Sequence, residues 1–103
     1  MAAKTEPFDV GDEIVFYADF ENEAGAAANP TDVDLFYRKP VSGAETQINK
    51  PDLSNPSTGR FEKKVILDEP GTWRFEFRGQ GTVTMVRKGT VRVLETEFAY
   101  PTP

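Results

Sequence analysis

Short runs of alternating apolar and polar residues, separated by glycine and proline, are the most constraining feature of this sequence. The clearest run is 72–78, where Trp73, Phe75 and Phe77 alternate with polar residues. Successive side chains of a β-strand point to opposite faces, so a period of two predicts a strand with one buried face. A chain built from such runs is expected to fold as packed β-sheets.

Similar runs occur along the rest of the chain, with turn signals about every 8–12 residues. We expect Lys63 to be an awkward polar member of one inward face, and Arg87-Lys88-Gly89 to interrupt the last strand as a bulge or bend. The longest loop is expected at 50–59, which is rich in proline, serine and asparagine. The other predicted strands are 13–20, 32–39, 45–49 (a short polar edge strand), 60–67 and 82–94. The residues expected in the core are Phe16, Leu35, Phe61, Trp73, Phe75, Phe77 and Val91.

This pattern predicts an all-β fold, an immunoglobulin-like β-sandwich of about seven antiparallel strands. A chain of 103 residues without an internal repeat suits one domain, which we expect at 8–94. Residues 1–7 are expected to be a flexible N-terminal arm and 95–103 an extended C-terminal tail. No apolar signal-peptide core is seen, and no run has the roughly 18 apolar residues of a membrane helix.

The sequence contains no histidine and no cysteine. It therefore lacks the commonest general base, the usual zinc ligands and a thiolate nucleophile, and an enzyme is not expected. Asp19, Glu21 and Glu23 are interpreted as a solvated acidic rim, because no calcium-loop spacing accompanies them. We expect no catalytic residue, no bound metal and no cofactor.

The charge balance disfavours two classes of partner. The formal net charge is −5, which opposes binding to nucleic acid or to an anionic membrane. Basic residues on the predicted strands alternate with Glu62 and Glu76, so cross-strand ion pairs explain them better than a nucleic-acid surface. The segment 79–81, Gly-Gln-Gly, is interpreted as a hairpin turn because it lacks the helix and lysine of a phosphate loop.

Large apolar side chains are also expected on outward faces of the strands. Val15 and Tyr17 lie out of phase with the inward residues of their strand, and Phe36 does the same on the next strand. Exposed apolar clusters are typical of partner surfaces, so we expect a patch of the Tyr17/Phe36 type to bind protein. Phe98 and Tyr100 are expected to dock onto a neighbour as part of an extended tail. The alternative is that loops cover the first three residues and that the tail frays.

The stretches STGRF (57–61) and VILDEPGTWRF (65–75) place a Pro-Gly corner before a tryptophan-containing strand. Together with FDVGD at 8–12 and GTVRV at 89–93, they resemble small immunoglobulin-like structural proteins of tailed bacteriophages. The resemblance covers most of residues 8–94. It implies a virion accessory, such as a head decoration, neck or tail-associated subunit, and it carries over no catalytic residues.

The resemblance implies a non-enzymatic structural component of a tailed-phage virion that acts through protein–protein contacts. Its partners would be capsid, neck or tail proteins, or further copies of itself. It would be made in the host cytoplasm and reside in the virion. The alternative is a secreted or surface-displayed immunoglobulin-like module that binds carbohydrate, such as a host-surface glycan, or another adhesive partner.

Overall fold

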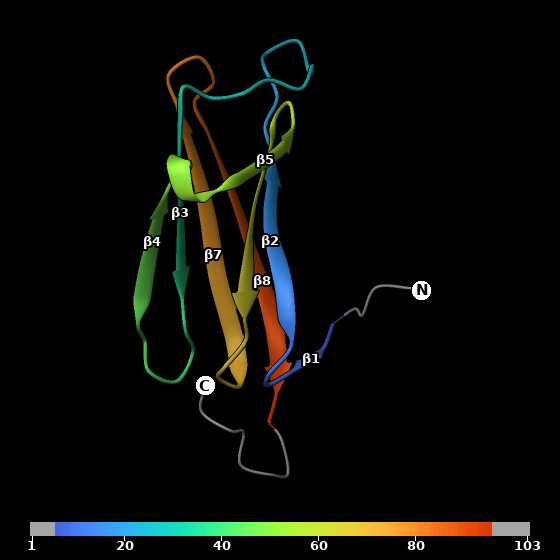
Figure 1. Ribbon diagram of the computed structural model, residues 1–103, viewed down its shortest axis with the longest axis vertical. Coiled ribbons are helices and arrows are strands. Elements are labelled where there is room, and N and C mark those ends of the chain that lie inside the picture. Colours follow the sequence, from blue (N-terminus) through green and yellow to red (C-terminus); the bar gives the residue numbers. More distant parts are fainter. Residues whose placement is uncertain (1–5, 96–103) are drawn as a thin grey trace.

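The computed structural model describes residues 6–95, which form two β-sheets and contain no α-helix (Figure 1). Within this range no helix is long and apolar enough to cross a membrane. The elements are β1 (Phe8–Asp9), β2 (Glu13–Asp19), β3 (Asp32–Arg38), β4 (Glu45–Asn49), the 3₁₀ turn η1 (Lys50–Asp52), β5 (Ser54–Ser57), β6 (Arg60–Ile66), β7 (Gly71–Gln80) and β8 (Met85–Leu94). One sheet has five strands in the order β1-β8-β7-β3-β4, and the other has three in the order β2-β6-β5. The predicted all-β class is confirmed.

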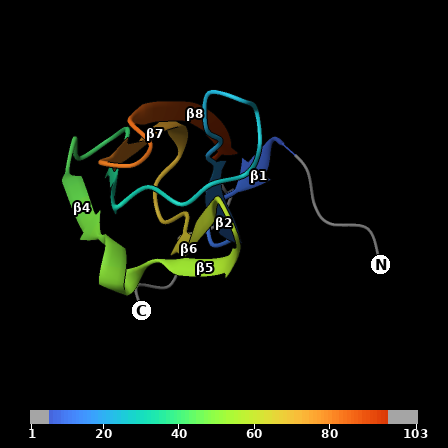
Figure 2. The same ribbon diagram turned by 90° about the horizontal axis from the view of Figure 1, so that it is seen from above.

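The two sheets curve around a shared interior in a sandwich-like arrangement (Figure 2). Their inward side chains form one hydrophobic core, because alternate residues of each strand point to the same side. Lys63 is half-buried opposite Phe16 in the β2–β6 register. Among the residues predicted for the core, Phe75 is half-buried and packs against the others, and Phe16, Leu35, Phe61, Trp73, Phe77 and Val91 are buried.

The Pro70-Gly71 corner directs the chain from β6 into β7 and sets the position of the tryptophan. Gly71 has a φ of 115°, a conformation that favours glycine. Two residues later, the side chain of Trp73 is fully buried, and its indole N–H donates a hydrogen bond to the Glu69 carbonyl at 2.9 Å. The corner and the core are therefore joined by one direct hydrogen bond.

Long-range pairing corrects the expected number and direction of the strands. Residues 6–95 form eight strands rather than about seven, and β1 pairs parallel with β8, so the strands are not all antiparallel. The predicted loop at 50–59 contains η1 and the strand β5, which pairs with β6 through Ser54 and Ser57. Because β5 is an edge strand, Pro56 can lie in it without removing a hydrogen bond from the middle of a sheet.

The predicted interruption of the last strand is wrong, because β8 pairs with β7 continuously from Met85 to Val93 without a shift of register. Gly89 faces Phe75 in this ladder, and the phenyl ring fills the space of the missing side chain. The glycine therefore accommodates a neighbour and does not break the strand. The turn before β8 also lies later than expected, at 81–84, because β7 continues through Gln80.

Candidate functional site

The outward apolar residues predicted for partner binding do not form one surface. Val15 and Tyr17 lie on β2 of the three-stranded sheet, and their exposed fractions are 41% and 52%. Phe36 lies on β3 of the other sheet and is half-buried, with the Arg78 guanidinium 4.5 Å from the centre of its ring. The outer faces of the two sheets point in opposite directions, so the expected Tyr17/Phe36 patch is wrong. The predicted contact residues Phe98 and Tyr100 lie outside the described residues.

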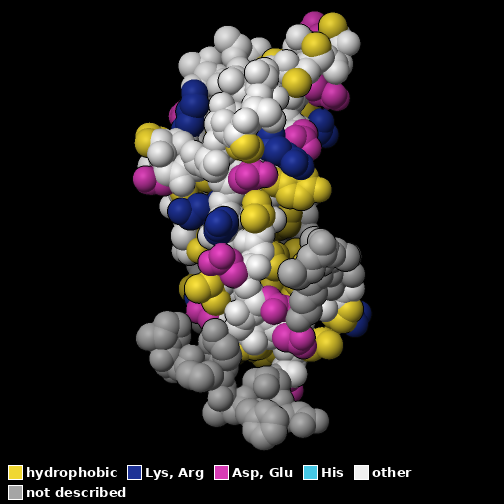
Figure 3. Space-filling view, turned by 45° about the vertical axis from the view of Figure 1, so that its right-hand side comes forward, with side chains coloured by type: hydrophobic (Ala, Val, Ile, Leu, Met, Phe, Trp, Pro, Cys, Tyr) yellow, Lys and Arg dark blue, Asp and Glu magenta, His cyan; other side chains and the backbone are white. Residues whose placement is uncertain are grey.

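A groove runs along the side of the molecule between β2 and β8. β2 is an outer strand of its sheet, and β8 is flanked on this side by only the two residues of β1. Figure 3 brings the β2 side forward and shows hydrophobic side chains emerging between acidic and basic ones. The apolar residues that line the groove come from both sheets and are Phe8, Ile14, Val15, Phe16, Tyr17, Ala18, Phe75 and Val91.

The main chain of β2 has a free edge that faces this groove. The N–H of Phe20 donates to the Gly59 carbonyl at 2.8 Å, and the N–H of Leu67 donates to the Asp12 carbonyl at 2.8 Å. In an antiparallel ladder every second residue turns its N–H and C=O toward the partner strand. The two bonds show which residues of β2 do so, because Asp12 and Phe20, at either end of β2, both bond the chain that contains β6. The even-numbered residues of β2 therefore bond β6. The main-chain groups of the remaining residues, Glu13, Val15, Tyr17 and Asp19, point away from β6 and toward the groove.

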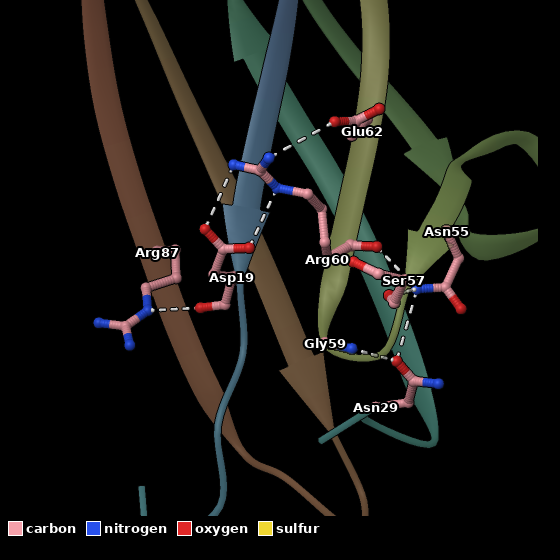
Figure 4. A network of polar contacts seen from close by, with 8 residues as sticks. All are labelled: Asp19, Asn29, Asn55, Ser57, Gly59, Arg60, Glu62 and Arg87. Carbon is pink, nitrogen blue, oxygen red and sulfur yellow. Dashed lines mark hydrogen bonds and ion pairs between the residues drawn. The ribbon is translucent and has the colours of Figure 1, made fainter. Parts of the chain in front are cut away.

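Arg87 of β8 spans one end of the groove and supports this phase assignment. Its Nε donates to the main-chain carbonyl of Asp19 at 3.2 Å (Figure 4). Its guanidinium also lies 3.7 Å from the Glu21 carboxylate. The contact ties β8 to the end of β2. Within residues 6–95, no hydrogen-bond partner is seen for the outward main-chain groups of the other three residues, Glu13, Val15 and Tyr17.

Arg60 of β6 holds the same end of β2 from the outer face. Its Nε and Nη2 lie 3.1 and 3.4 Å from the two carboxylate oxygens of Asp19, and its Nη1 lies 4.0 Å from Glu62 (Figure 4). The guanidinium also lies 4.1 Å from the ring centre of Tyr17 and covers one face of that ring. Asp19 is therefore engaged by arginine, and no group of three or more acidic residues within 6–95 is arranged to hold a metal ion.

An asparagine network fixes the β5–β6 hairpin beside the loop that leads to β3. The Gly59 N–H donates to Oδ1 of Asn29 at 2.7 Å (Figure 4). Nδ2 of Asn55 donates to the carbonyls of Ser57 and Arg60 at 2.8 and 2.7 Å. These bonds hold β6 in place, and β6 in turn holds the paired edge of β2, so the free edge belongs to a well-supported strand.

A second polar cluster lies at the Pro-Gly corner and does not contribute to the groove. Burial would raise the pKa of Glu69, but hydrogen bonds from the Ser42 N–H and hydroxyl and from the Val41 N–H outweigh it, and the pKa is lowered. Lys39 donates to the Asp68 carboxylate at 2.8 Å, and this hydrogen bond raises the pKa of the lysine despite its partial burial. These contacts anchor the β3–β4 loop, so we assign them a structural role.

The groove itself was not apparent from the sequence, although one signal pointed to it. Five consecutive apolar residues, 14–18, occur in β2, whereas a strand with one solvent-exposed face normally alternates apolar and polar residues. Such a run indicates a strand with apolar contacts on both faces. The contributions of Phe8, Phe75 and Arg87 have no comparable signal, because they depend on which strands become neighbours.

Comparisons with known proteins return no relative for this chain. No family model matches it, and neither a curated protein nor a solved structure matches it. The resemblance to tailed-phage proteins is therefore without support from these comparisons, and the candidate site is defined by its geometry alone.

Proposed function

We propose that this chain is a non-enzymatic, immunoglobulin-like structural component of a tailed-phage virion that acts through protein–protein contacts. The order of the strands supports the immunoglobulin-like part. In that fold, strands A, B, E and D form one sheet, and C, F and G form the other, extended by C′ in variable-type domains. The order β2-β6-β5 corresponds to B-E-D, and β8-β7-β3-β4 corresponds to G-F-C-C′.

The observation that carries the proposed binding role is the free main-chain edge of β2 beside an apolar groove. Unpaired N–H and C=O groups on an edge strand are a template for another polypeptide, and apolar pockets beside the edge provide specificity. The groove volume is about 1030 Å³. Small-molecule pockets usually have volumes of about 300–1,000 Å³, so the groove lies at their upper limit. Its size, the edge and the lining together favour a polypeptide partner.

The sequence resemblance supports the phage part of the proposal, and its residues lie at defined points of the fold. The segment 57–61 forms the β5–β6 hairpin, and Pro70, Gly71 and Trp73 form the corner and the buried indole. The virion would be its location, after synthesis in the host cytoplasm. Capsid, neck or tail proteins and further copies of the chain are the proposed partners.

Mass spectrometry of purified virions from the phage that encodes the chain tests this proposal. We expect the chain in a constant ratio to a capsid, neck or tail protein through successive purification steps. An early, non-structural phage protein from the same lysate serves as the control and should disappear during purification. Absence of the chain from purified virions would refute the proposal.

The carbohydrate-binding alternative gains no comparable support from the described residues. Trp73 is fully buried and cannot stack on a sugar ring, and Arg60 covers one face of Tyr17. Among the predicted outward aromatics, Phe36 is half-buried under Arg78. We therefore do not propose glycan binding as a second function.

A further inference from the structure

We propose that the groove beside β2 receives residues 96–100 of a second copy of this chain, which add a β-strand to the three-stranded sheet. The inference deepens the proposed structural role, on which it rests, by naming the partner and the edge that it uses. In the immunoglobulin-like comparison, the free edge of β2 is the place where strand A would pair. The second copy would supply a strand at that position.

The free edge and the proposed occupant match in length. The unpaired main-chain groups of β2 run from Glu13 to Tyr17, a span of five residues. They end where Arg87 already bonds the Asp19 carbonyl. β8 ends at Leu94, and of the six residues that follow it, 96–100 are the five directly before Pro101, which has no N–H to continue a ladder. One strand of that length would therefore satisfy the free edge.

The occupant also matches the groove in its pattern of side chains. In an extended segment 96–100, Phe98 and Tyr100 fall on one face, and Glu97 and Ala99 fall on the other. The groove offers Ile14, Phe75 and Val91 on its apolar lining. A strand paired with β2 would bury its aromatic face against these residues and leave the glutamate toward water. Burial of each aromatic side chain would favour binding in addition to the main-chain hydrogen bonds.

The position of β1 explains why the occupant comes from another copy. The C-terminal segment leaves β8 after Leu94, where β1 already pairs with β8 through Phe8 and Asp9 on the side of the groove. A segment from the same chain would have to cross β1 and reverse direction before it reached β2. The six residues between Leu94 and Pro101 would then have to make this crossing and this turn as well as pair with β2. A segment from a second copy can enter the groove without crossing β1 or reversing its direction.

Amide hydrogen exchange, with the mass measured by light scattering in parallel, tests the inference on the full chain. At a concentration where the mass exceeds the 11.5 kDa of one chain, the N–H groups of Glu13, Val15 and Tyr17 should exchange slowly. In a variant that ends at Glu95 they should exchange about tenfold faster or more, and the mass should be that of a monomer. The N–H groups of Phe16 and Ala18, which bond β6, should stay slow in both proteins and serve as the internal control.

A double variant, Phe98→Ser and Tyr100→Ser, tests whether the aromatic face is responsible. It should behave like the shortened variant, whereas Thr102→Ala, which lies beyond Pro101, should behave like the unchanged chain. Fast exchange of the three amides in the full chain would overturn the inference. So would an assembly that persists in the shortened variant, because it would use another surface. Slow exchange in a diluted monomer would also overturn it, because the segment would then come from the same chain.

The outcomes separate this inference from the proposed function. A chain that is present in virions but shows no protection of these amides would refute the second-copy contact alone. Protected amides in a chain that is absent from virions would refute the phage role and leave the contact between copies established.

Discussion

Phe75 lies opposite Gly89 in the β7–β8 ladder, and its ring occupies the space that a side chain at the glycine would need. A Cβ atom built on Gly89 would lie 2.7 Å from Cε1 of Phe75, far inside van der Waals contact. The same ring stacks on Phe16 of the other sheet, with the ring centres 4.5 Å apart. One aromatic side chain therefore connects a glycine in β8 with the strand β2 that carries the free edge.

Gly89→Ala should destabilise the protein because the added methyl group displaces the ring of Phe75. Overpacking of this kind costs about 1–3 kcal/mol, and we expect the free energy of unfolding to fall by that amount in urea titrations. Thr90→Ala changes the exposed neighbouring residue and should shift stability by less than about 0.5 kcal/mol. The double variant Gly89→Ala/Phe75→Leu should lose less stability than the sum of the losses in the two single variants, because the smaller leucine side chain makes room for the added methyl group. Equal stability of Gly89→Ala and the unchanged protein would refute this account of the glycine.

Trp73→Phe should lower stability through two losses at once. The substitution leaves space in the core and removes the N–H that donates to the Glu69 carbonyl. We expect a decrease of about 2–3 kcal/mol in the free energy of unfolding. Circular dichroism is the appropriate measurement, since the chain has a single tryptophan and the variant has no indole fluorescence. Tyr17→Phe removes a polar atom from an exposed ring and should change stability by less than about 0.5 kcal/mol.

Arg60→Lys should weaken the attachment of β2 to β6, although the positive charge is kept. Lysine cannot bond both carboxylate oxygens of Asp19 while stacking on Tyr17 as the planar guanidinium does. We expect a loss of about 0.5–1 kcal/mol at low salt, because the contact is partly exposed. Urea titrations of Arg60→Lys, Asp19→Asn and the double variant measure the coupling. Lys64→Arg is the matched control, and additive effects of the first two changes would contradict the proposed pairing.

Glu69→Gln should destabilise the protein at neutral pH and less so in acid. The pKa of Glu69 is lowered in the folded protein, so its charged form contributes stability above the unfolded pKa of about 4.3. That contribution is lost as the pH falls through the folded pKa. We expect Glu69→Gln to lower the free energy of unfolding by about 1 kcal/mol at pH 7. The difference in stability between the variant and the unchanged protein should disappear as the pH falls below about 4. Glu23→Gln, in an exposed loop, is the control, and a gap that does not change with pH would refute the role of the charge.

Periodicity located most of the strands because it is a local property of the sequence. The prediction of 45–49 as a polar edge strand agrees with β4, and those of 13–20 and 60–67 each exceed the observed strand by one residue. β5 was missed because its sequence, SNPS, has no apolar alternation and contains proline. Its strand geometry comes from its neighbour β6, which no local pattern can show.

The alternating pattern by itself determined that the chain is all-β, and it determined which side chains of each strand point inward, since a strand turns alternate residues to opposite faces. It also determined that Val15 and Tyr17 point outward. Only the tertiary structure decided that Phe36 lies on the opposite face, that β1 runs parallel to β8, and that β2 keeps an unpaired edge beside Phe75. The physical reason is that the neighbours of a strand are chosen by pairing between residues far apart in the sequence. The order of strands in the sheets, and with it the groove, therefore arises only when the whole core has assembled.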